Sequence, residues 1–262
     1  MISDDTLDRL RGVMVGAAAG DALGMPLEFA PAVPLSRMVC QMQPGRMEAG
    51  TFTDDTEMAL ALAESLLAHR PLDGDDLARR FVQWYRSNPP DIGIHTANVL
   101  GRIALGQPWM DAAADVQRRN PASASNGSVM RCWPVAVAWW NQPGWLAADS
   151  ALQSRVTHQH AECVAGSLFV NTLIALLVAG YPAPEAVEAV LSQVEMPDGL
   201  RKVIQAAPLR SRPELANSGW VRHTLESAVW GLLNFASFEE VVAQVANLGN
   251  DADTAACVAG AL

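Results

Sequence analysis

Two short acidic segments stand out in the sequence because each gathers oxygen-bearing side chains within four residues. Residues 53–56 read Thr-Asp-Asp-Thr and precede a stretch rich in Ala and Leu, and residues 251–254 read Asp-Ala-Asp-Thr and precede Ala-Ala-Cys-Val. Clustered carboxylates repel one another in a dry environment unless a cation neutralises them. The pair of segments therefore indicates a site at which both parts of the chain hold a cation.

The chemistry of these ligands narrows the choice of cation. Hard oxygen atoms with no Cys or His beside them favour Mg2+, Mn2+ or Ca2+ over Zn2+. Neither segment alone fills the six positions around an octahedral ion. Together they offer four carboxylates and several hydroxyls, which is enough for two ions when water or substrate oxygens complete each shell.

N-capping is the alternative explanation for either segment taken alone. Thr and Asp at the start of a helix accept hydrogen bonds from free backbone amides and complement the helix dipole. A cap needs only one oxygen-bearing residue, whereas each segment has three or more. The small apolar residues that follow each segment also indicate buried helices, so the two segments together favour a metal site.

Five segments, taken in order, resemble the ADP-ribosylglycohydrolase family. They are residues 20–24 with Glu28, residues 53–58, residues 126–131 with Pro134, residues 157–158 and residues 249–254. Any one of them is weak, but all five in family order cover nearly the whole chain. The sequence is therefore identified as a member of this family, which includes dinitrogenase reductase-activating glycohydrolases and ADP-ribosyl-acceptor hydrolases.

The resemblance implies an all-α fold with a dinuclear centre of two Mg2+ (or Mn2+) ions. It implies hydrolysis of the N- or O-glycosidic bond between ADP-ribose and an acceptor, so the expected substrate is an ADP-ribosylated protein or small molecule. Two vicinal ribose hydroxyls can meet a metal pair, and cleavage passes through an oxocarbenium-like state. The metal ligands that the resemblance implies are Thr53, Asp54, Asp55, Asp251, Asp253 and Thr254.

Three acidic residues are the catalytic candidates. Glu28 matches a mobile acidic residue of the family, and the alternative is a solvated loop glutamate after Pro26. Asp91 matches another acidic position near the family's cleft, and the alternative is an N-cap for a helix that begins near Ile94. Asp55, which is also one of the implied metal ligands, is the third catalytic candidate.

The segment around residue 126 is expected to bind substrate. Asn126, Gly127 and Ser128 come just before a helix, where backbone amides can approach a phosphate or ribose, although an ordinary cap is the alternative. His158 matches a family position that lines the cleft, and the alternative is a structural histidine. Arg131 could grip a diphosphate, but pairing with a structural carboxylate is favoured.

The elements that position these residues are predicted to be helices. Apolar residues recur at helical spacing from Leu7 to Ala17, and helices are expected over 56–69, 75–87, 94–105, 160–180, 183–193 and 221–234. No alternating pattern long enough for a strand is found. The prediction is an all-α, compact, single-domain orthogonal bundle of about a dozen helices over residues 1–262. Because the chain stops at Leu262, in the helix expected to open at Thr254, support behind Asp251 and Asp253 is expected to be thin.

Composition limits the classes of partner. Hydrophobic residues make up 50% of the 262 residues, and the net charge of −10 repels phosphate backbones, so general nucleic-acid binding is not expected. The four cysteines form no CxxC pair, which fits a reducing cytoplasm. The protein is also expected to be a monomer. The apolar stretch 163–180 carries Ser167, Asn171 and Thr172 without flanking basic residues. It is therefore expected to be a buried central helix and not a membrane helix.

Two other functions are compatible with these residues. Some family members are catalytically silent ADP-ribose-binding or structural proteins, but such members tend to lose metal-binding residues, and here the set is intact. The other possibility is a two-metal phosphoesterase that cleaves inside a nucleotide. The products distinguish the reactions, because a glycohydrolase releases free ADP-ribose whereas a phosphoesterase releases AMP and ribose phosphate.

Overall fold

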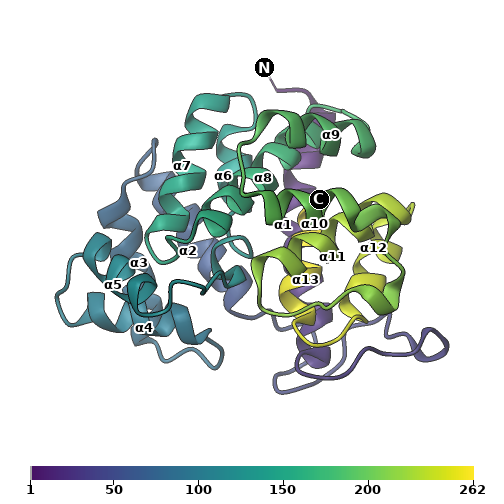
Figure 1. The fold of residues 1–262 in the computed structure, drawn as a ribbon, viewed down its shortest axis with the longest axis horizontal. Helices are drawn as coiled ribbons and strands as arrows, with labels where there is room; N and C mark the ends of the chain where they lie inside the picture. Colours follow the sequence, from purple (N-terminus) through teal and green to yellow (C-terminus); the bar gives the residue numbers. More distant parts are fainter. Residues whose placement is uncertain (1) are drawn as a thin grey trace.

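The described part of the chain, residues 2–262 of this computed structural model, folds into helices joined by loops (Figure 1). Within these residues there is no strand, and one isolated bridge pairs Ser125 with Trp220. The α-helices are α1 (Asp4–Gly24), α2 (Asp54–Ala68), α3 (Gly74–Arg86), α4 (Ile94–Ala104), α5 (Trp109–Arg119), α6 (Trp133–Trp139), α7 (Pro143–Arg155), α8 (Ala161–Val178), α9 (Ala183–Gln193), α10 (Asp198–Ala206), α11 (Val221–Asn234), α12 (Phe238–Ala246) and α13 (Ala252–Ala261). Short 3-10 helices are η1 (Met25–Leu27), η2 (Leu35–Arg37), η3 (Asn126–Ser128), η4 (Ala207–Leu209) and η5 (Arg212–Glu214). The all-α prediction is confirmed.

The helix limits follow local sequence signals. All six helices predicted from apolar spacing after residue 50 are present, with ends within about two residues of the prediction, which is the usual spread of helix assignment. Gly106 and Gly180 follow α4 and α8 with φ of 97° and 93°. Glycine reaches this left-handed region without a Cβ clash, so each residue ends its helix cleanly.

Helix α8 lies in the centre of the bundle, with α6, α7, α9 and α11 packed around it (Figure 1). By length and composition it is the one described helix that could cross a membrane, but 67% of it is buried inside the protein. Phe169, Leu173 and Ile174 are fully buried there. His160 caps the start of α8 by accepting a hydrogen bond from the Glu162 amide, as expected for a residue that begins this helix.

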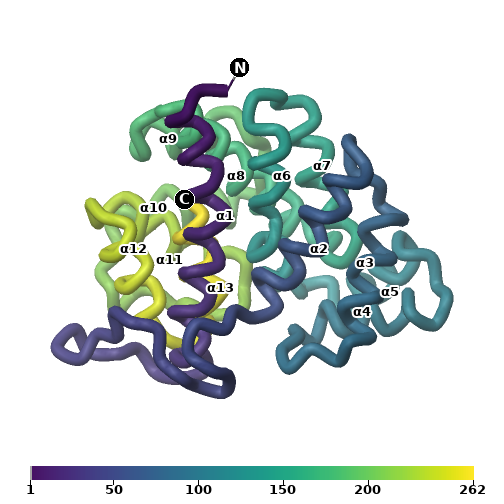
Figure 2. Tube along the Cα trace, turned by 180° about the vertical axis from the view of Figure 1, so that it is seen from behind, coloured from purple at the N-terminus to yellow at the C-terminus, as the bar shows by residue number. Residues whose placement is uncertain are grey.

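Helices α1 and α13 lie side by side, as the purple and yellow tubes show in Figure 2. Their backbones approach closely because small residues face one another. A Cβ on Gly20 would lie 2.0 Å from the carbonyl oxygen of Ala256, and a Cβ on Gly16 would lie 2.1 Å from that of Gly260. Every residue of α13 is buried. The expectation of thin support behind Asp251 and Asp253 is therefore wrong, because α1, α11 and α12 enclose this helix.

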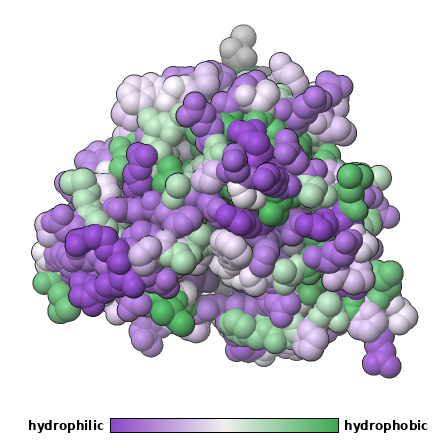
Figure 3. Space-filling view, viewed as in Figure 1, coloured by the Kyte–Doolittle hydropathy of each residue, from purple (hydrophilic) through white to green (hydrophobic). Residues whose placement is uncertain are grey.

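Most of the surface seen in Figure 3 is hydrophilic, with hydrophobic residues scattered in small groups. Helices α2 to α5 lie on one side of the molecule and α10 to α13 on the other (Figure 1). The long, mostly non-helical segment between η1 and α2 runs below α12 and α13. This arrangement brings the start of α2, the start of α13 and the loop before α4 toward one another.

Candidate metal centre and active site

The start of α2 is anchored by a residue of α1. Asp21 is fully buried, and its carboxylate accepts hydrogen bonds from the backbone amides of Thr53 at 2.9 Å and of Thr56 at 3.1 Å. The Thr56 hydroxyl donates to the same carboxylate at 2.6 Å. Asp21 therefore supplies from another helix the acceptor that the free amides of α2 need.

The side chains at the N-cap positions of α2 and α13 do not cap their helices. Thr53 and Asp251 occupy the N-cap positions of α2 and α13, but neither side chain accepts a hydrogen bond from an amide of its helix. The Thr53 hydroxyl instead donates to the Asp55 carboxylate. The N-capping alternative therefore does not account for these side chains, which remain available to a ligand.

Asp55 joins the two predicted metal-binding segments. Its Oδ2 atom accepts from the Thr53 hydroxyl at 3.2 Å and from the Thr254 hydroxyl at 3.3 Å, although Thr254 is 199 residues away in sequence. The other oxygen, Oδ1, is buried without a hydrogen-bond partner. A buried carboxylate oxygen without a partner is costly, so this atom is a natural ligand for a cation.

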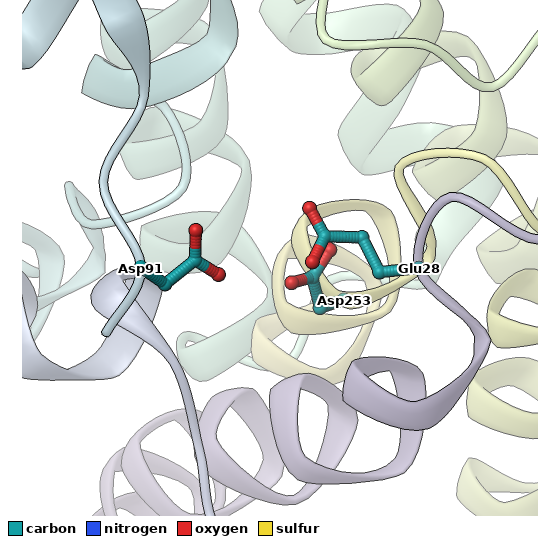
Figure 4. A group of neighbouring side chains, drawn as sticks. All are labelled: Glu28, Asp91 and Asp253. Carbon is teal, nitrogen blue, oxygen red and sulfur yellow. The ribbon is translucent and has the colours of Figure 1, made fainter. Parts of the chain in front are cut away.

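Three other carboxylates come together near the start of α13, as Figure 4 shows. Asp91 reaches in from the loop before α4, Glu28 comes from the loop after η1, and Asp253 lies on α13 between them. One oxygen atom from each lies within 4.8 Å of the others. The guanidinium of Arg46 contacts all three, at 3.4 Å from Asp253 and closer to Glu28 and Asp91. Arg46 is thus a cation that the chain itself supplies to this group.

The pKa values of these carboxyl groups are raised because the groups are buried close to one another. Burial and then the charges of neighbouring carboxylates raise the pKa of Asp54, Asp55 and Asp253 well above the ordinary value. Burial raises the pKa of Asp251 to about 6. Burial and the Asp91 charge raise the pKa of Glu28 to about 7, against the opposing effect of Arg46. Divalent cations would restore the ionised forms of the aspartates that bind them.

The carboxylates open onto a cavity of about 620 Å³. Its walls include Glu28, Asp54, Asp91, Asn126, Gly127, Asp251, Asp253 and Thr254 among the predicted site residues. Thr53, Asp55, Ser128 and His158 are predicted site residues that do not line it. Another surface groove, of about 630 Å³ between α9, α10 and α11, shares no residue with this cavity and is mainly apolar. The first cavity is therefore the candidate active site.

Of the four substrate-binding candidates, Asn126 and Gly127 line the cavity, whereas Ser128 and His158 lie behind its wall. The Asn126 amide donates to Thr224 at 2.8 Å and also contacts Asp251, so it orients that carboxylate. Gly127 has no room for a side chain, because a Cβ would lie 2.8 Å from the ring of His158. Ser128 is fully buried and donates to the Cys163 carbonyl at 3.4 Å, away from the cavity.

The structure also bears on the sequence predictions for Asp91 and Arg131. The N-cap of α4 is Gly93, so Asp91 does not cap that helix. Arg131 is fully buried and does not line the cavity, as a structural role requires. However, its partners are the Gln153 carbonyl, the Thr157 hydroxyl, the Met58 sulfur and the ring of Phe81, and among the described residues no carboxylate pairs with it.

Sequence reasoning missed two residues that shape the site. Asp21 lies inside the motif segment 20–24, but its contact with the start of α2 was not predicted. Arg46 had no signal, because a single arginine in a loop resembles any solvated cation. Only the fold brings it to Asp253, which is 207 residues away.

A family model described as ADP-ribosylglycohydrolase matches residues 2–262. The chain belongs to this family. An ADP-ribosylarginine hydrolase Tri1 of Serratia proteamaculans is 32% identical over 98% of this chain and 70% of its own length. The ADP-ribosyl-[dinitrogen reductase] glycohydrolase of Rhodospirillum rubrum is 29% identical over 97% of this chain and 84% of its own. A solved chain from an ADP-ribosylglycohydrolase-related protein complex superposes with a TM-score of 0.84 at 33% identity, covering 99% of this chain and 87% of that one.

The residues of this family member fit a site for divalent cations. The donors are oxygen atoms, and the buried Oδ1 of Asp55 lacks a partner. Asp54, Asp251 and Asp253 open on the same cavity, where carboxylate repulsion alone would be unfavourable. Oxygen donors of this kind suit Mg2+ or Mn2+ better than softer metals.

Proposed function

We propose that this chain hydrolyses the glycosidic bond between ADP-ribose and an acceptor, and that it uses two Mg2+ or Mn2+ ions. The observation that carries the proposal is the meeting of the start of α2 with the start of α13 at Asp55, beneath a cavity lined by carboxylates. Membership of the ADP-ribosylglycohydrolase family supports the reaction class. Neither argument depends on the other.

The proposed roles follow from position. Thr53, Asp54, Asp55, Asp251, Asp253 and Thr254 would hold the ions. When bound, the ions would supply positive charge that orients the vicinal hydroxyls of the ribose, and nearby carboxylates would stabilise the oxocarbenium-like transition state. Asn126 keeps Asp251 in place through its hydrogen bond, and Asp21 keeps the start of α2 in place.

Glu28 is the proposed acid or base. It lines the cavity from a loop and comes from neither metal-binding segment. A carboxyl whose pKa lies at about 7 exchanges a proton readily near neutral pH, as a general acid or base must. Asp91, on the opposite side of the group in Figure 4, would orient the acceptor or the attacking water.

An arginine side chain is the proposed acceptor. Relatives at 32% and 33% identity, from Serratia proteamaculans and Pseudomonas putida, are described as ADP-ribosylarginine hydrolases. The geometry of this chain gives separate support, because Glu28, Asp91 and Asp253 already surround the guanidinium of Arg46. A pocket that holds one guanidinium among carboxylates suits another.

A release assay tests the proposal directly. Arginine-linked and serine-linked ADP-ribose substrates are incubated with the protein, with and without Mg2+, and the products are separated. We expect free ADP-ribose from the arginine-linked substrate in the presence of Mg2+. Release of AMP and ribose phosphate would instead identify a phosphoesterase. ADP-ribose binding without release from either substrate would identify a catalytically silent member.

A further inference from the structure

A buried chain of hydrogen bonds runs from Arg131 to the wall of the cavity. The Arg131 guanidinium donates to the Thr157 hydroxyl at 2.6 Å, and this hydroxyl lies 2.7 Å from Nδ1 of His158. On the other side of the ring, Nε2 lies 2.9 Å from the hydroxyl of Ser125, which lines the cavity. Arg131, Thr157 and His158 are all buried.

The direction of each hydrogen bond in this chain follows from the first donor. Arginine only donates, so the Thr157 oxygen accepts from it. In the described part of the chain, the Thr157 hydroxyl proton has one acceptor within hydrogen-bond distance, the Nδ1 atom of His158. The ring is neutral, because burial, reinforced by the nearby charge of Arg131, holds the pKa of His158 well below its ordinary value. Its proton is therefore on Nε2 and is donated to Ser125.

We propose that Ser125 is a ligand-binding donor whose polarity is set by Arg131 through Thr157 and His158. Because the Ser125 oxygen accepts from His158, its own proton is left for a ligand. Among the described residues, no other hydrogen bond to this side chain is found. Thr157 and His158 are positioning residues, since they act on the ligand through Ser125.

The neighbouring Ser123 has the opposite polarity. Nε2 of His95 lies 3.0 Å from the Thr157 carbonyl, which only accepts, so the His95 proton is on Nε2. Nδ1 of His95 then accepts from the Ser123 hydroxyl at 3.3 Å. Ser123 also lines the cavity and presents lone pairs to it. Ser123 and Ser125, which are separated by one residue on the chain, thus offer an acceptor and a donor to the same ligand.

This assignment of a donor to Ser125 and an acceptor to Ser123 extends the proposed function and rests on it. The non-bridging oxygens of a diphosphate accept hydrogen bonds and cannot donate them, so the diphosphate of ADP-ribose suits Ser125. A ribose hydroxyl can donate, so it suits Ser123. The buried arginine beneath the cavity therefore acts on the ligand without touching it.

Two measurements test the relay. Nitrogen-15 NMR of the histidine rings in the ligand-free protein reports which ring nitrogen carries the proton. Calorimetric titration of ADP-ribose in the presence of Mg2+ reports affinity. The variants are Ser125→Ala, Thr157→Val, which keeps shape but removes the hydroxyl, and Thr157→Ser, which restores it. Thr172→Val on α8 is the matched control, and Ser123→Ala leaves the His158 chain intact.

We expect the wild type to carry the His158 proton on Nε2 and the Thr157→Val variant to show a mixture of tautomers. Ser125→Ala and Thr157→Val should each weaken ADP-ribose binding about three- to tenfold, the effect of one hydrogen bond. Thr157→Ser should restore both readouts, and neither Thr172→Val nor Ser123→Ala should alter the His158 tautomer.

A wild-type proton on Nδ1 of His158 overturns the relay, and so does unchanged affinity in Ser125→Ala. If Thr157→Val loses affinity and Thr157→Ser does not recover it, the effect of Thr157 is packing and the relay is likewise wrong. Failure of the wild type to bind ADP-ribose overturns the proposed function instead, and the tautomer pattern then still decides the direction of the hydrogen bonds.

Discussion

Glu28 lies at the mouth of the metal-binding region with a side chain that is 8% exposed. Glu28→Gln keeps its shape and removes its charge. A general acid or base contributes mainly in the transition state, so kcat should fall by ~10²–10⁴-fold. The affinity for ADP-ribose should stay within about tenfold of wild type, roughly 1.4 kcal/mol. Steady-state kinetics and calorimetric titration of ADP-ribose with Mg2+ present measure the two effects.

Glu48→Gln is the matched control for this change. Glu48 is exposed on the same segment between η1 and α2 and should keep wild-type kinetics. Near-normal turnover of Glu28→Gln would show that Glu28 is an ordinary loop glutamate. Asp55 and Asp91 would then be the next candidates for the catalytic carboxylate.

Asp55 and Asp251 test whether the two segments form one site. If both hold metal, Asp55→Ala and Asp251→Ala should each abolish activity, and the double variant should be no worse than either single one. Binding of Mn2+ followed by electron paramagnetic resonance should be lost in parallel. Losses that multiply in the double variant would indicate two separate sites.

The sequence could predict the carboxylates of this region but not what surrounds them. Residues 53–56 and 251–254 were found because three oxygen-bearing residues close together exceed what a cap needs. The Arg46 contact could not be predicted, because it depends on the path of a long segment with little regular structure. His158 was expected in the cleft but lies behind Gly127, since sequence spacing does not show which side of a loop a ring occupies.

At the scale of elements, the contact between α1 and α13 controls the position of both Asp21 and Asp253. A Cβ on Gly20 would lie 2.0 Å from the Ala256 backbone, which cannot move aside as a side chain can. Gly20→Ala should therefore lower the free energy of unfolding by at least about 3 kcal/mol, the upper range for overpacking. It should also weaken Mg2+ binding. Urea denaturation and metal titration measure these effects.

Gly12→Ala, also on α1, is expected to stabilise the protein and not to destabilise it. No atom lies within 4 Å of a Cβ at this exposed position. Alanine should therefore raise the free energy of unfolding by about 0.5–1 kcal/mol through its better helix propensity. If both variants have the same stability, the close contact between α1 and α13 does not exist in solution.

Some helices could be predicted from apolar spacing and end signals in the sequence, and others could not. Six were found within about two residues of their ends because glycines, prolines and apolar spacing agree there. Helix α7 spreads its apolar residues around its axis, and α10 and α12 are only nine residues long. Their stability comes from tertiary packing, which periodicity in a single sequence does not show.

At the scale of the whole molecule, removal of metal should abolish activity. The reason is that the crowded carboxylates need divalent charge to hold the substrate. Turnover should vanish with excess EDTA and return with Mg2+ or Mn2+, whereas Zn2+ should substitute poorly. Full turnover after dialysis against EDTA would contradict the two-metal proposal.

Metal-free protein should lose stability as pH rises, which is the reverse of the usual carboxylate effect. The pKa of Asp251 rises from 3.8 to about 6 on folding and that of Glu28 from 4.5 to about 7. Because the folded form holds these protons more tightly, their contribution is complete below about pH 4 and is lost through pH 6 to 7. Added Mg2+ should therefore raise the melting temperature more at pH 8 than at pH 5.5. Thermal scans at both values, with and without Mg2+, measure this, and an equal shift would argue against carboxylate ligands.

The meeting of α1 with α13 also has a consequence for biosynthesis. The glycine face of α1 leaves the ribosome long before its partner has been translated. During that interval Gly16 and Gly20 have no α13 to cover them, and Asp21 has no assembled site to support. The hydroxyl of Thr254 reaches Asp55 from 199 residues further along the chain, so the site can close only late in translation. A nascent chain stalled before α13 should therefore be the form that most needs a chaperone.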